Sequence, residues 1–597
     1  MIDFPKDETL MISGLDAWAY PSSEHDLQEF IIREERLEKR LGVSHFRRPP
    51  DFRIKGAGVT NPSLKIPAVR FPQWHVCRWC GAMERLELFS DRQRCKRTNM
   101  EKGRTCSNVP EKRRQFLAPA RFITVCQKGH ISDFPWMEWV HGKDSGLTNN
   151  CQLKLSTGGS ASIQGIFVGC SCGKFKSMNA VFDHQSMTRL GITCGGEMPW
   201  MGDTSHSPSR CGQELRVVAK GGSNVYFPIQ VSSIYLPLWA ESATKSVIQI
   251  LEDPRTWALI SQSTEEGELN SVMVEAVAQM RNVNSAELLE YAKRKLRGET
   301  SLTPNKAITE EEFRQDEYVA LREGRGDTNS ELSTRVADPK DYERPISDAL
   351  ASLTLVDQLR ETRAYAGFSR VIPEDQTDYS VKRSMLRLDR SINWIPAITV
   401  TGEGLFIEFD KDKLDEWAQQ KSVVERAKTL ATNHHRAQTA RQISIQGNVS
   451  PKFFMLHTLA HLLINQLSFD CGYGSSSLKE RIYCNLAEDD APMQGILIYT
   501  ASGDSEGTMG GLVRQGEKGN LENIFIRAIR NARWCSSDPV CIESTGQGPG
   551  SCNLAACHSC TLLAETSCEK GNKLLDRAFV IGTPAHPKLG FFNFLNT

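Results

Sequence analysis

The last quarter of the chain carries the clearest hydrophobic pattern. Apolar residues follow a helical spacing over Phe453–Leu467 and again near Leu521–Ala532, and each run predicts a helix. Between these runs, Gly495–Ala501 is almost continuously apolar, which is typical of a strand buried on both faces. The pattern therefore predicts a C-terminal α/β domain over residues 448–597.

Helical periodicity also marks residues 236–296. Trp239, Ala243 and Val247 follow one another at intervals of four, and Leu288–Leu296 repeats the pattern with polar residues between the apolar ones. This spacing places the apolar side chains on one face of a helix. We therefore expect a helical region in the middle of the chain.

Residues 297–345 differ from both of their neighbours. They are rich in charged residues, Ser and Thr and poor in large apolar side chains, so they are expected to form a charged linker or insertion. Apolar periodicity returns over residues 346–447, where Ile398–Val400 and Phe406–Phe409 predict strands. The pattern indicates a middle α/β region there.

The N-terminal part has shorter elements. Residues 1–66 form a polar segment with an expected helix near Glu24–Leu41. Residues 67–225 are rich in Cys and Gly, and only short strands are predicted, at Ala161–Val168 and Leu215–Val218. Such short strands bury little apolar surface, so this region needs another source of stability.

Composition restricts the class of protein. The chain has 597 residues, of which 40% are hydrophobic, and its 72 Lys and Arg balance 72 Asp and Glu. These values are ordinary for a soluble multidomain protein, and they exclude disordered, collagen-like and coiled-coil chains. No apolar run has the length of a membrane helix, and the first residues lack the pattern of a secretory signal. We expect a cytoplasmic protein without a membrane partner.

The 18 cysteines are clustered: ten lie between Cys77 and Cys211 and six between Cys535 and Cys568. Disulfides are not maintained in a reducing compartment, so clustered cysteines favour metal binding over disulfides there. Cysteine with some histidine is the ligand set that Zn²⁺ prefers. The expected class is a mixed α+β multidomain protein with a zinc-ribbon-like N-terminal region, a helical middle and a zinc site in the C-terminal α/β domain.

Spacing divides the N-terminal ligands into three expected zinc sites. Two thiolates separated by two residues can bind one tetrahedral ion, and a following glycine allows the tight turn. The first site is expected to use Cys77, Cys80, Cys95 and Cys106. The second is expected to be a cysteine-only site made by Cys170, Cys172, Cys194 and Cys211. A third, mixed site would use Cys126, His130, His141 and Cys151, unless the two histidines are hydrogen-bonded core residues.

The C-terminal cluster holds more cysteines than one zinc ion needs. The expected ligands are Cys541, Cys557, Cys560 and Cys568, with Cys535 as the first replacement. Sites closed by four protein ligands leave no position for water, so they stabilise a fold and do not catalyse.

Motifs of catalysis are absent from the sequence. It has no phosphate-binding loop of the Gly-x-x-x-x-Gly-Lys-[Ser/Thr] type and no Gly-x-Ser-x-Gly elbow. His457 and His461 share one helix face but lack the Glu of a His-Glu-x-x-His protease, which favours a structural or DNA-facing role. The glycine-rich turn Gly507–Leu512 is either a phosphate-binding loop or a tight connection.

A basic stretch surrounds the first expected zinc site. Residues 92–114 carry nine Lys and Arg against two Glu. A basic loop held by a metal suits contacts with DNA phosphates, whereas the plainer interpretation is a solvated surface loop. The expected DNA contacts are Arg94, Lys96, Arg97, Lys102, Arg104, Lys112, Arg113 and Arg114.

Several strings together resemble the DrmB family of the DISARM antiphage system. They are Trp74–Cys80, Pro119–Phe122, Cys126–His130, Asp133–Trp136, Trp139–His141, Cys170–Cys172, Cys194 with Pro199–Trp200, Gly367–Arg370, His457–His461, Gly472–Tyr473, Glu480–Arg481, Gly507–Leu512, Asp538–Pro539 and Glu565–Cys568. The C-terminal third is similar to a zinc domain that is appended to superfamily-2 helicases of the mitomycin-repair type.

The resemblance implies a non-catalytic accessory subunit that forms a heterodimer with a separate superfamily-2 helicase, DrmA, and acts on phage DNA. Two other functions compete with this one. A metal-dependent nuclease would use His457, His461 and Asp504. A scaffold would organise the helicase without contacting DNA itself.

Overall fold

The computed structural model divides the chain into two compact units, residues 1–233 with 362–399 and residues 234–361 with 400–597. It describes residues 1–597 except the following: 6, 52–53, 56–58, 61–63, 98–105, 107–108, 143–150, 159–161, 203–209, 237–246, 248–249, 252, 263, 266–267, 282, 297–308, 325–330, 345, 374–378, 441–448, 475, 486–491, 501–510 and 597.

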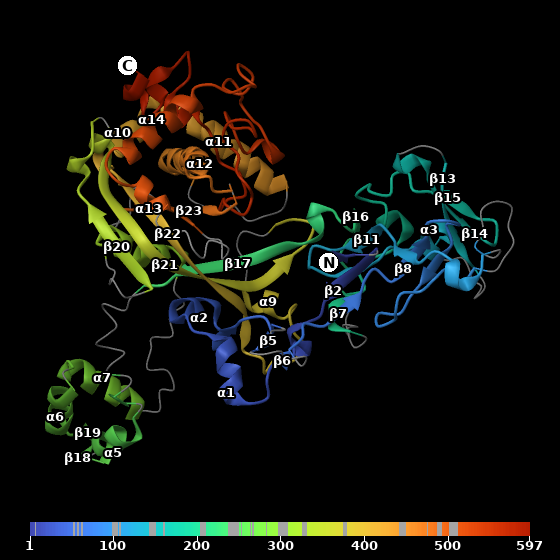
Figure 1. Cartoon of the computed structure of the whole chain (residues 1–597), viewed down its shortest axis with the longest axis horizontal. Coiled ribbons are helices and arrows are strands. Elements are labelled where there is room, and N and C mark those ends of the chain that lie inside the picture. Colours follow the sequence, from blue (N-terminus) through green and yellow to red (C-terminus); the bar gives the residue numbers. More distant parts are fainter. Residues whose placement is uncertain are drawn as a thin grey trace. The chain divides into compact units, whose positions relative to one another are not determined.

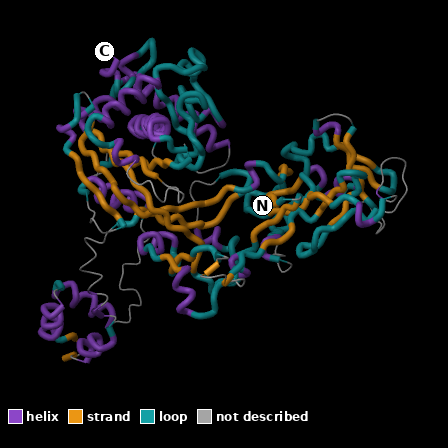
Figure 2. The backbone as a smooth tube through the Cα atoms, in the orientation of Figure 1, coloured by secondary structure: helices purple, strands orange, loops and turns teal. Residues whose placement is uncertain are grey.

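Short strands and loops make up most of the first unit (Figure 2). Four three-stranded antiparallel sheets form there, in the orders β1-β2-β7, β10-β8-β9, β12-β11-β16 and β13-β14-β15. Their strands are β1 (Ile2–Phe4), β2 (Glu8–Ile12), β7 (Ala68–Arg70), β8 (Trp74–Cys77), β9 (Met83–Arg85), β10 (Leu117–Pro119), β11 (Phe122–Val125), β12 (Ile131–Asp133), β13 (Leu153–Thr157), β14 (Ile166–Cys170), β15 (Phe175–Ser177) and β16 (Arg216–Ala219).

The helix expected near Glu24–Leu41 is interrupted. The chain forms α1 (Glu24–Leu27), a strand β3 (Ile31–Ile32) and α2 (Glu35–Leu41) in its place. The two β-branched residues of β3 pair with β4 (His45–Arg47), and this pairing outweighs the helical tendency of the charged residues around them. The first unit also contains α3 (Trp136–His141), α9 (Tyr379–Arg383) and the short pair β5 (Ile54–Lys55) and β6 (Val59–Thr60).

Long strands form the sheet of the second unit. There β20 (Leu332–Ala337) lies beside β21 (Leu350–Ser369), with which it pairs (Figure 1). Across the sheet, β21 is followed by β22 (Trp394–Phe409), β24 (Gln494–Thr500) and β23 (Leu478–Cys484). The boundary between the two units falls within β21 and within β22. The two strands predicted between 398 and 409 are therefore one continuous strand, and β17 (Phe227–Ile234) pairs with β21.

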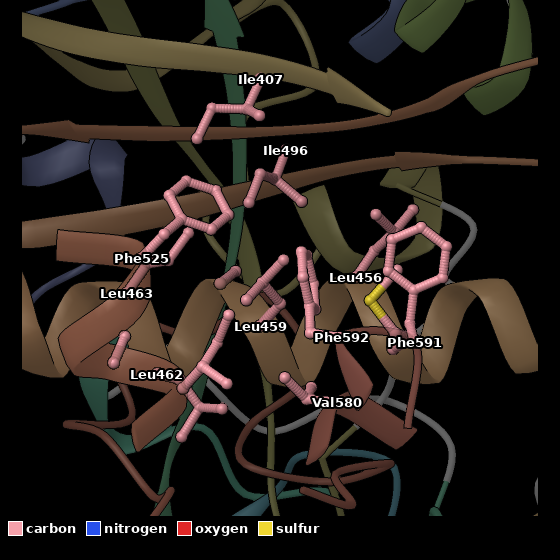
Figure 3. Packing of buried hydrophobic residues seen from close by; sticks show 14 of the residues in the cluster. Ile407, Leu456, Leu459, Leu462, Leu463, Ile496, Phe525, Val580, Phe591 and Phe592 are labelled. Atoms are coloured by element: carbon pink, nitrogen blue, oxygen red, sulfur yellow. The ribbon is translucent and has the colours of Figure 1, made fainter. Parts of the chain in front are cut away.

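The helix α12 (Pro451–Cys471) is the centre of the C-terminal core. Ser450 caps its first turn and Gly472, at a φ of 73°, ends it. Its side chains are buried on all faces from Lys452 to Ile464, as expected of a helix that is apolar all round. Figure 3 shows α12 between sheet residues such as Ile496 and, on its other side, Val580.

The remaining helices of the second unit are α5 (Pro254–Gln262), α6 (Ser271–Arg281), α7 (Ser285–Leu296), α8 (Glu310–Arg322), α10 (Lys411–Ala418), α11 (Lys421–Ala440), α13 (Gly511–Gln515), α14 (Asn520–Ala532) and α15 (Ala578–Ile581), with the strand pair β18 (Thr264–Glu265) and β19 (Glu268–Leu269). The helices near 453–467 and 521–532 are thus confirmed, and so is the buried strand as far as Thr500, whereas Ala501 lies outside the described residues. Within the expected helical region, the described residues form α5, α6 and α7. Trp239 and Ala243 lie outside the described residues.

The segment expected to be a charged linker is largely structured where it is described. It contains α8, which begins with a capping box between Thr309 and Glu312, and β20. Phe313 and Tyr318 of α8 are buried, and the charged residues of the helix lie on its outer face except Glu317, which is buried as well. The mixed α+β multidomain class is confirmed, and no described helix has both the length and the apolar character needed to cross a bilayer.

Candidate metal centres

Four groups of Cys and His side chains converge in the described residues. Within each group the four ligand atoms lie within 4.8 Å of one another. Tetrahedral sulfur ligands about 2.3 Å from zinc would lie ~3.8 Å apart, so this spacing fits a zinc ion. The groups are site 1 (Cys77, Cys80, Cys95, Cys106), site 2 (Cys126, His130, Cys194, Cys211), site 3 (His141, Cys151, Cys170, Cys172) and site 4 (Cys535, Cys541, Cys557, Cys560).

Site 1 is built on a turn at the end of β8. The N–H of Gly81 donates to the carbonyl of Cys77 at 2.8 Å, and the backbone of Gly81 has a φ of 75°. The Sγ of Cys77 lies 3.6 Å from that of Cys106, and the Sγ of Cys80 lies 3.6 Å from that of Cys95. These distances are too long for disulfides and match two ligand pairs of one zinc ion.

Site 2 joins the turn after β11 to a loop about seventy residues later. The Sγ of Cys126 lies 3.4 Å from Nδ1 of His130. Cys194 is brought near because its loop leads to β16, which pairs with β11. The N–H of Gly196 donates to the Sγ of Cys194 at 3.4 Å, a contact that stabilises a thiolate.

Site 3 lies between the end of α3 and the end of β14. The Sγ of Cys172 is 3.3 Å from Nε2 of His141, and Nδ1 of His141 is 2.8 Å from the carbonyl of Met137. When Nδ1–H donates to that carbonyl, Nε2 keeps its lone pair for a metal. Cys172 is exposed, so site 3 is the most open of the four.

The structure groups these eight ligands differently from the expectation. Cys170 and Cys172 were expected to share a site with Cys194 and Cys211, and the structure does not bring these pairs together. The pair Cys170 and Cys172 is separated from the pair Cys194 and Cys211 because β14 pairs with β13 and β15, whereas β16 pairs with β11 in another sheet. Each pair therefore meets a histidine and a cysteine, and both sites are mixed. Both histidines place a ring nitrogen next to a cysteine sulfur of their site. A histidine that only makes hydrogen bonds in the core would not need this position.

Site 4 corrects the expected C-terminal set. Its fourth ligand is Cys535, whose Sγ lies 3.4 Å from that of Cys557, and the Sγ of Cys541 lies 3.9 Å from that of Cys560. Cys568 is not part of site 4; it lies against His457 of α12. The loop between Cys560 and Cys568 reaches β23, where the N–H of Glu480 donates to the carbonyl of Ser567 at 3.1 Å, and this contact holds Cys568 away from site 4.

A buried arginine supports site 4. The side chain of Arg577 is fully buried, forms an ion pair with Asp538 and donates to the carbonyl of Ala532 at 2.6 Å. Burial disfavours its charge, yet Asp538 and the thiols of Cys560 and Cys541 raise the pKa of Arg577. The guanidinium offsets part of the −2 charge that four thiolates and Zn²⁺ would carry together.

One thiol in each site has a lowered pKa. The value is about 4 for Cys80 and Cys126, about 5 for Cys541 and about 7 for Cys172. In the first three the largest cause is a hydrogen bond from another cysteine of the site, and in Cys172 it is the backbone N–H of Lys174. The thiolate is the form that binds metal, so each site contains a thiol prepared for it.

The basic residues around site 1 fall into two kinds. Arg94 and Arg114 donate to backbone carbonyls of the module, those of Arg114 and Val109 respectively, so they hold its loops together. Lys96, Lys112 and Arg113 have exposed side chains. Arg97 reaches the carbonyl of Leu153 at 3.5 Å, and Lys102 and Arg104 lie outside the described residues.

The glycine-rich turn ends at a helix whose N–H groups are occupied. The N–H groups of Leu512 and Val513 donate to the carboxylate of Glu403 at 2.9 and 3.3 Å, and Tyr473 donates to it as well. A phosphate would have to displace this internal anion, which favours the interpretation as a tight connection. Asp504 and residues 507–510 lie outside the described residues.

Comparison with known proteins agrees with this arrangement. Residues 459–561 match the family described as the MrfA Zn-binding domain, a range that contains all four cysteines of site 4. Residues 1–227, which contain sites 1 to 3, match a domain family of unknown function, DUF8724. Zinc is thus the metal that fits both the ligands and the matched C-terminal domain.

A relative extends the similarity to nearly the whole molecule. The chain is 30% identical over 600 residues to the DISARM protein DrmB of Bacillus paralicheniformis, and the alignment covers 97% of each protein. The chain therefore belongs to the DrmB family of DISARM proteins.

Proposed function

We propose that this protein is a zinc-stabilised, non-catalytic DNA-binding subunit that partners a superfamily-2 helicase in defence against phage. Sites 1 to 4 are proposed to hold one Zn²⁺ each through the ligands that converge there. The observation that carries the DNA-binding part is the set of exposed basic side chains, Lys96, Lys112 and Arg113, fixed beside the ligands of site 1.

A metal-held basic loop suits DNA for two reasons. Lys96 directly follows the ligand Cys95, whose N–H donates to the carbonyl of Gln115, so the backbone beneath the charges is fixed. Ordering a loop in advance lowers the entropy lost when it binds. Each phosphate contact releases counterions and makes the affinity depend on salt.

The scaffold alternative has one observation in its favour. Arg94 and Arg114 contact carbonyls within the protein, and these contacts reduce the number of charges that are free to meet phosphates. A nuclease is disfavoured, since His457 and His461 have no exposed surface and a DNA phosphate cannot reach them. Four-ligand zinc sites also leave no open position for an attacking water.

The DNA proposal is tested by replacing Lys96, Lys112 and Arg113 together with Gln. The control replaces three exposed lysines of the second unit, Lys428, Lys518 and Lys588, with Gln; it removes the same charge elsewhere. Fluorescence anisotropy with labelled DNA is measured over a salt series. We expect the first variant to bind more weakly and to lower the slope of log K against log salt by up to ~2–3.

An unchanged slope in the loop variant, or an equal loss in the control, would contradict the assignment of this loop. A wild-type chain that shifts no DNA but still forms a complex with the helicase would support the scaffold. Zinc content is measured in every variant, so that loss of site 1 is not mistaken for loss of a phosphate contact.

Site 4 offers a surface for the helicase. Trp534 and Val540, which directly precede the ligands Cys535 and Cys541, are 72% and 78% exposed. Large exposed apolar side chains on a rigid module are typical of a protein interface. We expect Trp534→Ala to reduce co-purification with the helicase at least tenfold, whereas Phe175→Ala, which removes a comparably exposed ring from the first unit, leaves it unchanged.

A further inference from the structure

A fifth group of potential ligands lies in the core of the second unit. His457 and His461 are one turn apart on α12, Glu480 lies on β23, and Cys568 lies in the loop before α15. The Nε2 of His457 is 3.2 Å from the Sγ of Cys568 and 3.0 Å from Oε1 of Glu480. The Nε2 of His461 is 3.4 Å from Oε2 of Glu480. All four ligand atoms converge within 4.8 Å.

This group is as deeply buried as site 1 and more deeply buried than sites 2 to 4. The side chains of His457, His461 and Glu480 have no exposed surface, and Cys568 is 8% exposed. A carboxylate is seldom buried unless a cation or several hydrogen bonds compensate for its lost hydration. Two histidines of one helix and a thiol from a distant loop are unusual neighbours for a carboxylate that has only a structural role.

The hydrogen bonding is incomplete where a metal would lie. Nε2 of His461 and Oε2 of Glu480 have no hydrogen-bond partner among the described residues, although they are 3.4 Å apart. Buried polar atoms are nearly always paired, and such exceptions call for an explanation. A cation between these two atoms would bind both of them.

Outer contacts hold the ligands in position. Nδ1 of His461 lies 3.0 Å from the carbonyl of Thr561, so Nδ1–H can donate there while Nε2 faces the other ligands. The Sγ of Cys568 accepts the backbone N–H groups of Lys570 at 3.4 Å and Asn572 at 3.2 Å. These are the hydrogen bonds that a buried thiolate requires.

The strand and the loop that carry the other two ligands are also joined directly. The backbone N–H of Glu480 donates to the carbonyl of Ser567 at 3.1 Å, and the N–H of Glu569 donates to Oε1 of Glu480 at 3.2 Å. The loop is thus fixed to β23 on both sides of Cys568. The geometry of the group does not depend on one flexible side chain.

We propose that His457, His461, Glu480 and Cys568 bind a second zinc ion in the C-terminal unit, separate from that of site 4. Two imidazole nitrogens, one carboxylate and one thiolate form a donor set that suits Zn²⁺. One thiolate and one carboxylate neutralise the charge of the ion, so the complex as a whole is neutral. A neutral complex is compatible with full burial, whereas a four-thiolate site would leave a charge of −2.

The two C-terminal sites are connected through one residue. The carbonyl of Thr561 faces His461, and its hydroxyl donates to the Sγ of the site 4 ligand Cys560 at 3.2 Å. The match to the MrfA Zn-binding domain, residues 459–561, contains the ligands of site 4 but neither His457 nor Cys568. The fifth group is therefore a site that the matched domain does not account for.

Zinc content of the full chain tests the proposal. Cys568→Ser and His457→Gln are compared with the wild type by mass spectrometry of bound metal, and each is expected to contain one equivalent less. Cys552→Ser is the matched control, since Cys552 is also buried in the C-terminal cluster but belongs to no ligand group among the described residues. The double variant Cys541→Ser/Cys568→Ser is expected to lose two equivalents.

Unchanged zinc in the Cys568 and His457 variants would overturn the proposal, as would a loss of only one equivalent in the double variant. If these variants do not fold, the wild type decides: after replacement of zinc by cadmium, ¹¹³Cd NMR should show one resonance far from those of the thiolate-rich sites. A spectrum with thiolate-rich resonances alone would refute the fifth site.

Discussion

Arg481 and Glu317 form a two-point ion pair in the core of the second unit. Nη1 of Arg481 lies 2.7 Å from Oε1 and 2.6 Å from Oε2 of Glu317, and both side chains are almost completely buried. Burial alone would lower the pKa of Arg481, but Glu317 raises it well above its ordinary value. Arg481 therefore stays charged and depends mainly on Glu317 for compensation, with Glu569 at 3.8 Å from its Nε as a more distant second anion.

We expect Glu317→Gln to destabilise the second unit by about 3–5 kcal/mol, because it leaves the charge of Arg481 buried without its partner. Denaturant unfolding followed by intrinsic fluorescence measures the change. Asp316→Asn is the control: Asp316 is the exposed neighbour on α8, and its replacement should change stability by less than about 0.5 kcal/mol. Equal effects of the two variants would contradict the role of the pair.

The grouping of the N-terminal ligands predicts which variants lose the same zinc ion. Cys126→Ser/Cys194→Ser removes two ligands of site 2 and should cost one equivalent of zinc, the same loss that is expected of either single variant. Cys172→Ser/Cys194→Ser affects sites 2 and 3 and should cost two. If the first double variant instead cost two equivalents and the second cost one, the grouping expected from the sequence would be correct. Metal mass spectrometry on the purified chains gives the answer.

Gly81 is expected to be essential for site 1. A Cβ at this position would lie 2.1 Å from the carbonyl oxygen of Leu155, and the backbone has a φ of 75°. Gly81→Ala therefore combines a clash with roughly 1–2 kcal/mol of backbone strain, and zinc should pass faster to a chelator. Gly173→Ala in the turn of site 3 is the control, because it has a φ of 90° but no neighbour within 4 Å. Similar zinc release in both would mean that the clash is unimportant.

Asp133 predicts a pH dependence of stability. Burial raises its pKa to about 6, although the N–H groups of Gln73 and Trp74 donate to its carboxylate. Since its folded pKa lies above the ordinary value of 3.8, the protein binds this proton more tightly when folded, and stability falls as pH rises from about 4 to about 6. Asp133→Asn removes this titration, so the difference in stability between wild type and variant should change by up to ~3 kcal/mol over this pH range.

The comparison is made by denaturant unfolding at several pH values, with Asp91→Asn as an exposed control. Protonation of zinc ligands affects wild type and variants alike, so the difference between them isolates Asp133. A difference that stays constant from pH 4 to pH 7 would contradict the prediction.

The spacing of residues in the sequence predicted which side chains are zinc ligands better than it predicted which of them share one site. The closely spaced pair Cys77 and Cys80 and their two partners could be predicted, because a turn of a few residues determines its own geometry. Cys194 could not be assigned to Cys126, since their proximity comes from the pairing of β16 with β11. Glu480 had no spacing that indicated a metal ligand; only the register of β23 beside α12 places it near His457.

The core helix and strand were predicted because their apolar runs are long and unbroken. The burial of Glu317 was not predicted, because its neighbours are charged and a single acid does not show in sequence which way it faces. Its partner Arg481 lies 164 residues further along the chain. The periodicity of hydrophobic residues in the sequence does not reveal long-range pairing of this kind.

Sites 2 and 3 are nested: the four residues of site 3 all lie between His130 and Cys194. During synthesis, Cys126 and His130 leave the ribosome first but must wait for Cys211, while the inner set is complete at Cys172. Cys170 and Cys172 are thus available as competitors for the earlier pair before its proper partners exist. The inner site 3 can close before the partners of Cys126 and His130 exist, and its closure would remove Cys170 and Cys172 from this competition.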